Sequence, residues 1–272
     1  MKQTLFDALP DPEPYRVLCW FSCGVTSLVA AKLTLAEHPG AQIVRIRIGT
    51  EHKDADRYAD DAAKWLGRPL TVLTPPDGDH WRVILRTRWI KGPNGARCTK
   101  ELKTLVRIAY QRPGDLHVFG FDADEADRVE DFRENNPDIL FRAPLIEAGL
   151  TKSDCKRIEE RAGIQPHAMY RLGYSNANCV GCVKGGMGYW NRIRVDFPGV
   201  FSHMARIERE IGATILRHRG GPMKGERLHL DELDPSAGRF EEDQPSECGP
   251  LCQVALERVG LLETNRASGA IA

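Results

Sequence analysis

The sequence predicts an α/β protein in which a doubly wound, mainly parallel five-stranded sheet carries a helical, cysteine-containing C-terminal extension. Short apolar runs alternate with helix-like segments five times along residues 15–165, which is the pattern of parallel strands joined by crossover helices. Residues 166–272 break this alternation and bring a glycine- and asparagine-rich stretch with paired cysteines. The chain of 272 residues is long enough to bury a full α/β core.

The predicted strands are short apolar or alternating runs that end at small or turn-forming residues. They cover residues 16–21, 42–48, 70–74, 116–121 and 139–145. Helices are predicted where apolar residues recur at helical spacing. They cover residues 27–37, 54–66, 80–90, a segment that opens at 97–103, 151–162, most of 187–211, and 253–262. The acidic run 122–128 is predicted as a solvated loop, and the polar segment 212–244 as a flap.

Composition excludes some classes of protein. Lys+Arg and Asp+Glu are both 38, so the net charge gives no reason to expect a nucleic acid, although a local basic patch is compatible with it. No apolar stretch reaches about 18 residues, which predicts no transmembrane helix and no membrane partner. Residues 1–14 lack the apolar core of a secretion signal, so we expect a cytoplasmic protein. Eight cysteines in such a protein favour metal or redox chemistry over disulfides.

The first predicted strand runs through small residues into a helix. Such a turn directs several backbone N–H groups toward one point, and the helix dipole adds positive partial charge there. We predict a phosphate site, with a capped βα turn as the plainer alternative. Its residues are Ser22, Cys23, Gly24, Val25, Thr26 and Ser27, which match neither a Walker A motif nor a dinucleotide fingerprint. Thr50, at the carboxyl end of the second strand, is a further candidate because open parallel sheets bind ligands there.

Cysteine spacing provides the second functional signal. Cys179 and Cys182 flank two residues in a turn-forming stretch, and thiolates at this spacing bind one metal ion or one edge of a cluster. Further candidate ligands are Cys98, Cys248 and Cys252. The two C-terminal cysteines with the first pair would make a tetrahedral zinc site. Cys98 with the first pair would instead make a three-cysteine iron–sulfur site with one open iron.

Several segments, in order along residues 15–185, together resemble the phosphoadenosine phosphosulfate (PAPS) reductase family of the adenine nucleotide α-hydrolase-like superfamily. They are the 22–27 loop, Arg97-Cys98-Thr99 with Lys103, Gly120 with Glu125 and Arg128, and 168–174 leading to Cys179-x-x-Cys182. The loop is similar to the pyrophosphate (PP) loop of ATP pyrophosphatases, except that Cys23 stands where the family has Gly. The resemblance implies a HUP-like fold whose loop binds the phosphates of an adenine nucleotide beside Gly120, with Arg128 as a further anion-binding residue.

The resemblance implies an ATP-dependent sulfur-transfer enzyme first. Relatives with a similar loop use ATP with Mg²⁺ to adenylylate an oxygen and replace it with sulfur, and they include tRNA thiolases and DNA phosphorothioation proteins. By that resemblance Cys98 would take part in sulfur handling, and an iron–sulfur cluster, or zinc as the alternative, would lie on the cysteines. A cysteine desulfurase would supply sulfur, and a nucleic acid or a small molecule would accept it.

Two other interpretations remain open. One is a sulfonucleotide reductase that acts on PAPS or adenylyl sulfate (APS) with a thioredoxin-like reductant, because Glu247-Cys248-Gly249 partly matches the end of those enzymes. Cys248 would then be the nucleophile. The third interpretation is a non-catalytic nucleotide-binding or zinc-stabilised interaction module. In each case we expect an N-terminal arm over residues 1–14, a nucleotide-binding PP-loop domain over 15–165 and the cysteine-containing extension over 166–272.

Overall fold

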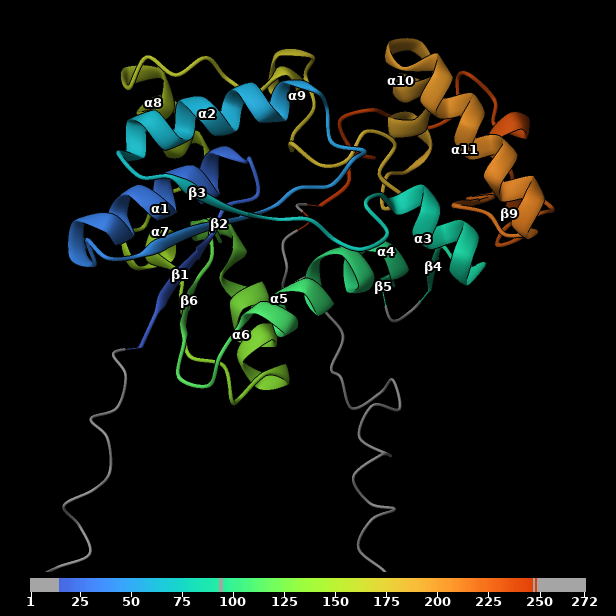
Figure 1. Cartoon of the computed structure of the whole chain (residues 1–272). Coiled ribbons are helices and arrows are strands. Elements are labelled where there is room, and N and C mark those ends of the chain that lie inside the picture. The colour runs from blue at the N-terminus through green and yellow to red at the C-terminus, as the bar shows by residue number, and fades with distance from the viewer. Residues whose placement is uncertain (1–14, 93–94, 247, 249–272) are drawn as a thin grey trace, which may run out of the picture.

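The computed structural model describes residues 15–92, 95–246 and 248 of the chain. Five parallel strands form its main sheet in the order β3-β2-β1-β6-β7 (Figure 1). The strands are β1 (Val17–Trp20), β2 (Gln42–Ile46), β3 (Leu70–Leu73), β6 (Leu116–Val118) and β7 (Phe141–Arg142). Each lies inside one of the runs predicted from the sequence, so the α/β class and the five-stranded parallel sheet are confirmed.

Successive residues of the central strand β1 pack into different cores, one on each face of the sheet. Cys19 packs with residues of α1 and α2, whereas Leu18 and Trp20 pack with residues of α3, α5 and α6. Because side chains alternate across a strand, a strand covered by helices on both faces is apolar at every position. The covering helices are α1 (Val25–Glu37), α2 (Asp54–Leu66), α3 (His80–Thr87), α5 (Leu105–Tyr110) and α6 (Ala126–Asn135).

The strand order reverses beside β1. The chain adds β2 and β3 on one side of β1, and then β6 and β7 on the other. In doubly wound sheets, ligands bind in the crevice beyond the carboxyl ends of the strands at such a point. The 22–27 loop follows β1 and Gly120 follows β6. The phosphate loop predicted from the sequence therefore lies where this architecture places a ligand.

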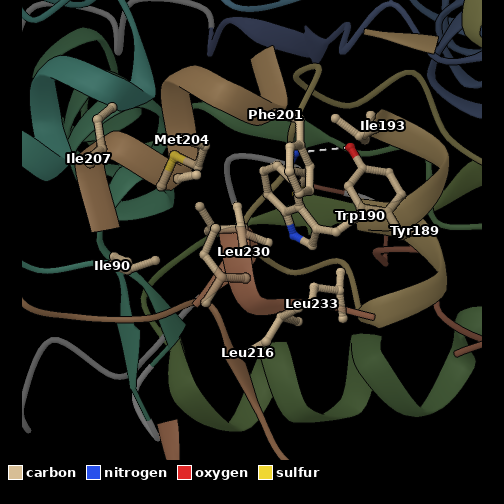
Figure 2. Close-up of a cluster of buried hydrophobic side chains, with 14 of the residues drawn as sticks. Ile90, Tyr189, Trp190, Ile193, Phe201, Met204, Ile207, Leu216, Leu230 and Leu233 are labelled. Carbon is tan, nitrogen blue, oxygen red and sulfur yellow. Dashed lines mark hydrogen bonds between the residues drawn. The ribbon is translucent and has the colours of Figure 1, made fainter. Parts of the chain in front are cut away.

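A second hydrophobic core lies beside the sheet, and α10 (Met187–Asp196) and α11 (Pro198–Ile211) contribute much of it (Figures 1 and 2). Trp190 and Met204 are fully buried there. The hairpin of β4 (Lys91–Gly92) and β5 (Gly95–Ala96) packs against the same core. Ile84, Ile90 and Ala96 therefore pack with the C-terminal part of the chain, although in the sequence they stand between two strands of the main sheet.

The segment 212–244 is not the flap that the sequence predicts. Leu216, Leu228, Leu230 and Leu233 are buried in the second core (Figure 2). The short strands β8 (Leu216–Arg217) and β9 (Arg227–Leu228) pair in an antiparallel hairpin that leads to the 3₁₀ turn η3 (Leu230–Glu232). The prediction was wrong because a few leucines, separated by charged residues, are enough to anchor a polar segment to an existing core.

The acidic run 122–128 is also not the predicted loop. Asp122 caps the 3₁₀ turn η2 (Ala123–Glu125), where its carboxylate accepts from the Asp124 backbone N–H at 3.0 Å, and α6 follows directly. Acidic side chains favour the positive end of a helix, so this composition indicated a helix start.

Two prolines change the bounds of predicted elements. Pro144 begins α7 (Pro144–Glu147) and shortens the last strand, and Pro198 divides the predicted helix 187–211 into α10 and α11.

The remaining elements connect these parts. They are α4 (Arg97–Thr99), the π-helical turn η1 (Lys100–Thr104), α8 (Lys152–Arg161) and α9 (Ala168–Arg171). Within the described part of the chain, no helix is both long and apolar enough to cross a bilayer. The predicted helix 253–262 and Cys252 lie outside the described residues.

Candidate functional site

The 22–27 loop joins β1 to α1 at the carboxyl edge of the sheet, and Ser27 sets its shape. The Ser27 hydroxyl donates to the Gly24 carbonyl at 2.8 Å and accepts from the Ser22 backbone N–H at 3.1 Å. The backbone N–H of Val25 donates to the Tyr170 hydroxyl at 3.3 Å. Ser22 is half-buried, and the other loop residues, Thr26 included, are buried.

Cys23 shapes the loop through its backbone. Its φ of +58° lies in the left-handed region, which costs a non-glycine residue about 1–2 kcal/mol. The thiol is buried and donates to the Ala55 carbonyl at 3.7 Å, and burial raises its pKa well above the usual range. Cys23 therefore adopts the conformation that favours glycine, the residue that the resembling family has here, and does not offer a reactive thiolate.

Gly120 brings the end of β6 directly onto the start of α1. A Cβ atom at this position would lie 2.6 Å from both the Cα and the backbone nitrogen of Ser27. Any other residue would push the strand end away from the loop. Gly120 therefore supports the loop by allowing this close approach.

Two lysines of α8 lie beside Tyr170. The ammonium groups of Lys152 and Lys156 lie 5.8 and 5.5 Å from the centre of the Tyr170 ring, whose hydroxyl contacts Val25. Cations beside an aromatic ring are held by its negative face. This cationic group was not identified from the sequence, because the lysines come from a helix far along the chain and carry no motif.

Arg128 and Thr50 lie on different sides of the site. Arg128, on α6, pairs with Glu125 and its guanidinium lies 5.3 Å from the centre of the Phe121 ring, just after Gly120. Thr50 is buried, and its carbonyl accepts from the Val180 backbone N–H at 2.8 Å. Thr50 therefore joins the end of β2 to the 179–182 turn, whereas Arg128 lies beyond the end of β6.

One cavity brings together four of the five cysteines that the sequence indicates as ligands. Cys98, Cys179, Cys182 and Cys248 all line it. The other lining residues are Ile48, His80, Ala96, Thr99, Leu102, Lys103, Val183 and Lys184. Cysteines distant from one another in the sequence, on α4, on the 179–182 turn and near the end of the described chain, therefore meet at one place.

The 179–182 turn is held by hydrogen bonds of two of its backbone N–H groups. The bond between Val180 and Thr50 holds the first half, and the Cys182 backbone N–H donates to the Tyr189 hydroxyl at 2.9 Å. Gly181 between them has a φ of +75°, and a Cβ atom there would lie 2.7 Å from Val200 Cγ1. The turn is therefore anchored to the main sheet on one side and to the second core on the other.

Cys248 is brought to the cavity by a hydrogen-bonded segment that we call the strap (residues 243–246 and Cys248). Asn178 holds it on two sides, since its amide nitrogen donates to the Ser246 carbonyl at 2.9 Å and its amide oxygen accepts from the Cys248 backbone N–H at 3.1 Å. Further along, Asn176 donates to the Pro245 carbonyl at 2.8 Å. The Lys103 ammonium donates to the Cys248 carbonyl.

Burial and nearby positive charge have opposite effects on the pKa values of these thiols. Burial raises the pKa of Cys98 to about 12 and raises the pKa values of Cys179 and Cys182, while the Lys103 ammonium lowers all three. A metal ion would favour thiolates more strongly than one ammonium does. Among the residues described, no three His, Cys, Asp or Glu side chains are arranged to hold a metal ion in this structure.

The cavity also contains a histidine that the sequence did not single out. His80 is buried, and burial lowers its pKa to about 4. Its Nδ1 lies 2.6 Å from the Thr50 hydroxyl oxygen. No spacing signal relates His80 to the cysteines, because only folding brings the start of α3 to the 179–182 turn.

The loop and the cavity adjoin each other. The charges of Glu51 and Lys103 both act on the Cys23 thiol and on the Cys179 thiol. No known family model matches the sequence, and no curated protein sequence matches it. The functional assignment therefore depends on the residues and their geometry.

Proposed function

We propose that this chain is an adenine-nucleotide-binding, sulfur-handling enzyme that uses ATP to activate an acceptor oxygen and then replaces that oxygen with sulfur. The observation that carries the proposal is the adjacency of a strand–loop–helix turn and a cavity lined by four thiols, connected through Glu51 and Lys103. An anion site beside several thiols, at the ligand-binding edge of a parallel sheet, suits the transfer of sulfur to a nucleotide-activated group.

ATP would lie at the carboxyl edge of the sheet with its phosphates on the 22–27 loop. The first turn of α1 offers backbone N–H groups and the positive end of a 13-residue helix. Lys152, Lys156 and Arg128 add charge around the loop, and Mg²⁺ would neutralise part of the phosphate charge. The resemblance of the loop to the PP loop supports the same placement.

The proposed reaction has two displacements and no net electron transfer. An acceptor oxygen attacks the α-phosphorus of ATP, the bond to the bridging oxygen breaks, and pyrophosphate leaves. Hydrosulfide then attacks the carbon that bears the adenylylated oxygen, the carbon–oxygen bond breaks, and AMP leaves with the oxygen. The loop amides and the lysines beside Tyr170 would stabilise the negative charge that develops on the phosphates.

The four thiols suit a soft metal centre. Cys98, Cys179 and Cys182 would hold an iron–sulfur cluster, with Cys248 and Cys252 as further candidate ligands and zinc as the alternative metal. A cluster with an open iron would supply a position for sulfide. Lys103 would balance the thiolate charge, and Leu102 and Val183 would exclude water from the cavity.

The cellular setting follows from the same thiols. None of the described cysteines forms a disulfide, which supports a reducing compartment, the cytoplasm. There a cysteine desulfurase would take sulfur from cysteine as a persulfide, and a thioredoxin-like dithiol would reduce that persulfide, release hydrosulfide and be oxidised to a disulfide. The acceptor would be a nucleic acid or a small molecule.

Two measurements on the full chain, purified without oxygen, test the proposal. Titration calorimetry is expected to show that ATP with Mg²⁺ binds more tightly than phosphoadenosine phosphate. Elemental analysis is expected to find iron and acid-labile sulfide, with absorption near about 400 nm from cysteine-ligated iron. Binding of neither nucleotide would contradict the assignment of the loop, and absence of both iron and sulfide would contradict the cluster.

The position of Cys248 favours one alternative activity, sulfonucleotide reduction. Its thiol lies 3.4 Å from the Thr99 hydroxyl, inside the cavity. A Cys248 thiolate would attack the sulfur of the sulfonucleotide, the sulfur–oxygen bond would break, and the nucleotide would leave. A thioredoxin-like dithiol would then release sulfite and be oxidised to a disulfide. A clear preference for phosphoadenosine phosphate over ATP would select this activity, and zinc without nucleotide binding would indicate an interaction module.

A further inference from the structure

His80 is part of the cavity wall and has one nitrogen without a protein partner. The residue opens α3, directly after the helix cap Asp79, and only 2% of its surface is exposed. It lines the same cavity as the four thiols. Among the residues that the structure describes, its Nε2 has no hydrogen-bond partner. A buried polar atom without a hydrogen-bond partner is unfavourable, so this nitrogen is a candidate ligand atom.

When the cavity thiols are metal ligands, the hydrogen bonds of Thr50 determine which nitrogen of the His80 ring carries the proton. The Thr50 hydroxyl contacts both His80 Nδ1, at 2.6 Å, and the Cys179 thiol. A ligating thiolate can only accept, so the single hydroxyl proton of Thr50 goes to Cys179. The Thr50 oxygen must then accept from Nδ1–H. This leaves Nε2 deprotonated, with its lone pair available.

We propose that Nε2 of His80 is a nitrogen ligand of the metal centre in this cavity, beside Cys98, Cys179 and Cys182. The inference rests on the proposed function in one respect, that the cavity holds a metal centre. Metal-ligating histidines generally donate their other N–H to an oxygen acceptor, and Thr50 is that acceptor here. Mixed histidine and cysteine ligation is chemically suited to zinc and to iron–sulfur centres alike.

In the competing arrangement, the His80 ring has only a structural role and binds no metal. Burial lowers the pKa of His80, and the backbone of Gly181 offsets a small part of this lowering, so a ring that donated Nε2–H toward the Gly181 carbonyl would be a helix-to-turn contact with no ligand. In that arrangement Nδ1 would accept the Thr50 proton. The two arrangements differ in whether a histidine nitrogen is bonded to the metal, which spectroscopy measures directly.

The test uses the full chain with ¹⁵N-labelled histidine, loaded without oxygen with Fe²⁺ and sulfide, and in a separate sample with Co²⁺ alone. Pulsed EPR of the paramagnetic forms is expected to show a strongly coupled histidine nitrogen. The variant His80→Ala is expected to lose this coupling. It should also bind Co²⁺ on the order of 10- to 100-fold more weakly in competition with a chelator. If His80→Ala does not fold, the nitrogen coupling measured in the wild-type protein decides by itself whether a histidine is bonded to the metal.

His203→Ala is the matched control. The His203 ring packs on Trp81 with 4.5 Å between ring centres, close to α3, but it does not line the cavity. This variant is expected to keep both the nitrogen coupling and the Co²⁺ affinity. A wild-type centre without histidine coupling, or a His80→Ala protein that keeps it, would overturn the inference and leave the proposed function in place. A wild-type chain that binds neither metal would overturn both.

Discussion

At the scale of single residues, Cys23 combines an unfavourable backbone conformation with a buried side chain. Cys23→Ala and Cys23→Gly both remove the thiol contact with Ala55, but only glycine relieves the left-handed backbone. We therefore expect the glycine variant to be more stable than the alanine variant by about 1 kcal/mol, measured as free energy of unfolding in urea. At Cys19, in the extended strand β1, we expect the opposite order, with the alanine variant more stable than the glycine variant. An alanine variant at position 23 as stable as the glycine variant would contradict this reasoning.

Ser27 is the residue on which the shape of the loop depends. Removing its hydroxyl breaks the bonds to Gly24 and Ser22, so Ser27→Ala is expected to weaken ATP binding by about 1 kcal/mol or more in calorimetry. Ser153→Ala, at an exposed position of α8, should leave the affinity unchanged. Unchanged affinity in a folded Ser27→Ala protein would exclude the loop as the phosphate site.

His117 links stability to pH. Its Nδ1 accepts from the Trp20 indole N–H at 2.9 Å, and burial lowers its pKa from 6.5 to about 4. The unfolded chain therefore binds a proton at a higher pH than the folded chain. Its contribution to stability is complete above pH 6.5 and is lost as the pH falls toward 4.

The variant His117→Gln is expected to flatten this decline in urea unfolding experiments across the same range. The remaining slope would come from groups such as His80 and His167, whose pKa values burial also lowers to about 4. Parallel stability profiles for the wild type and the variant would show that His117 is not the titrating group.

At the scale of elements, the strap determines whether Cys248 stays in the cavity. Asn178→Ala removes both side-chain bonds beside Ser246 and Cys248, so we expect faster alkylation of Cys248, followed by peptide mass spectrometry. Asn191→Ala removes a comparable pair of bonds, to Asp234 and Ala237, away from the strap, and should not change the rate. Equal rates in both variants would show that the strap does not depend on Asn178.

The elements that were predicted well have strong local patterns. Strand β2 and helix α2 follow from an Ile-rich run and from apolar residues at helical spacing, and both appear within a few residues of the predicted ends. The hairpin β4–β5 was not among the predicted strands, because each of its strands has only two residues and is held by the second core. Short elements of this kind are stabilised by tertiary packing, and sequence patterns do not record it.

At the scale of the whole molecule, the cysteines divide into two groups with different expected behaviour. Cys98→Ala, Cys179→Ala and Cys182→Ala should each lose bound metal and activity, because these thiols share the cavity. Cys19→Ala and Cys155→Ala should lose neither, because both thiols are buried in the cores beside the sheet. Elemental analysis checks this prediction, and metal retained by any of the first three variants would contradict it.

The variants Cys248→Ser and Cys252→Ser test whether these two cysteines bind the metal or act in turnover. We expect both to lower the metal content, as ligands would. Full metal content with loss of turnover in Cys248→Ser would instead indicate a nucleophile. Cys252 lies outside the described residues, so only Cys248 has a structural argument, its place in the cavity wall.

The sequence alone indicated the loop and most of the cysteines of the candidate site, but not the contacts between them. The cysteine pair at 179 and 182 and the loop after β1 have motifs with a physical meaning, and the structure brings them to the same sheet edge. His80 and the lysines of α8 have no such motif. Their importance depends on contacts between segments that lie far apart along the chain, and one sequence contains no direct record of such contacts.

The order in which the thiols occur along the chain has a consequence for biosynthesis. Cys98, Cys179 and Cys182 leave the ribosome before Cys248, and the strap that carries Cys248 is bonded to Asn178, next to the turn that Tyr189 of the second core holds. The cavity wall is therefore completed only after Cys248 has been synthesised. Any centre that needs the fourth thiol cannot be completed on the segments that carry the first three.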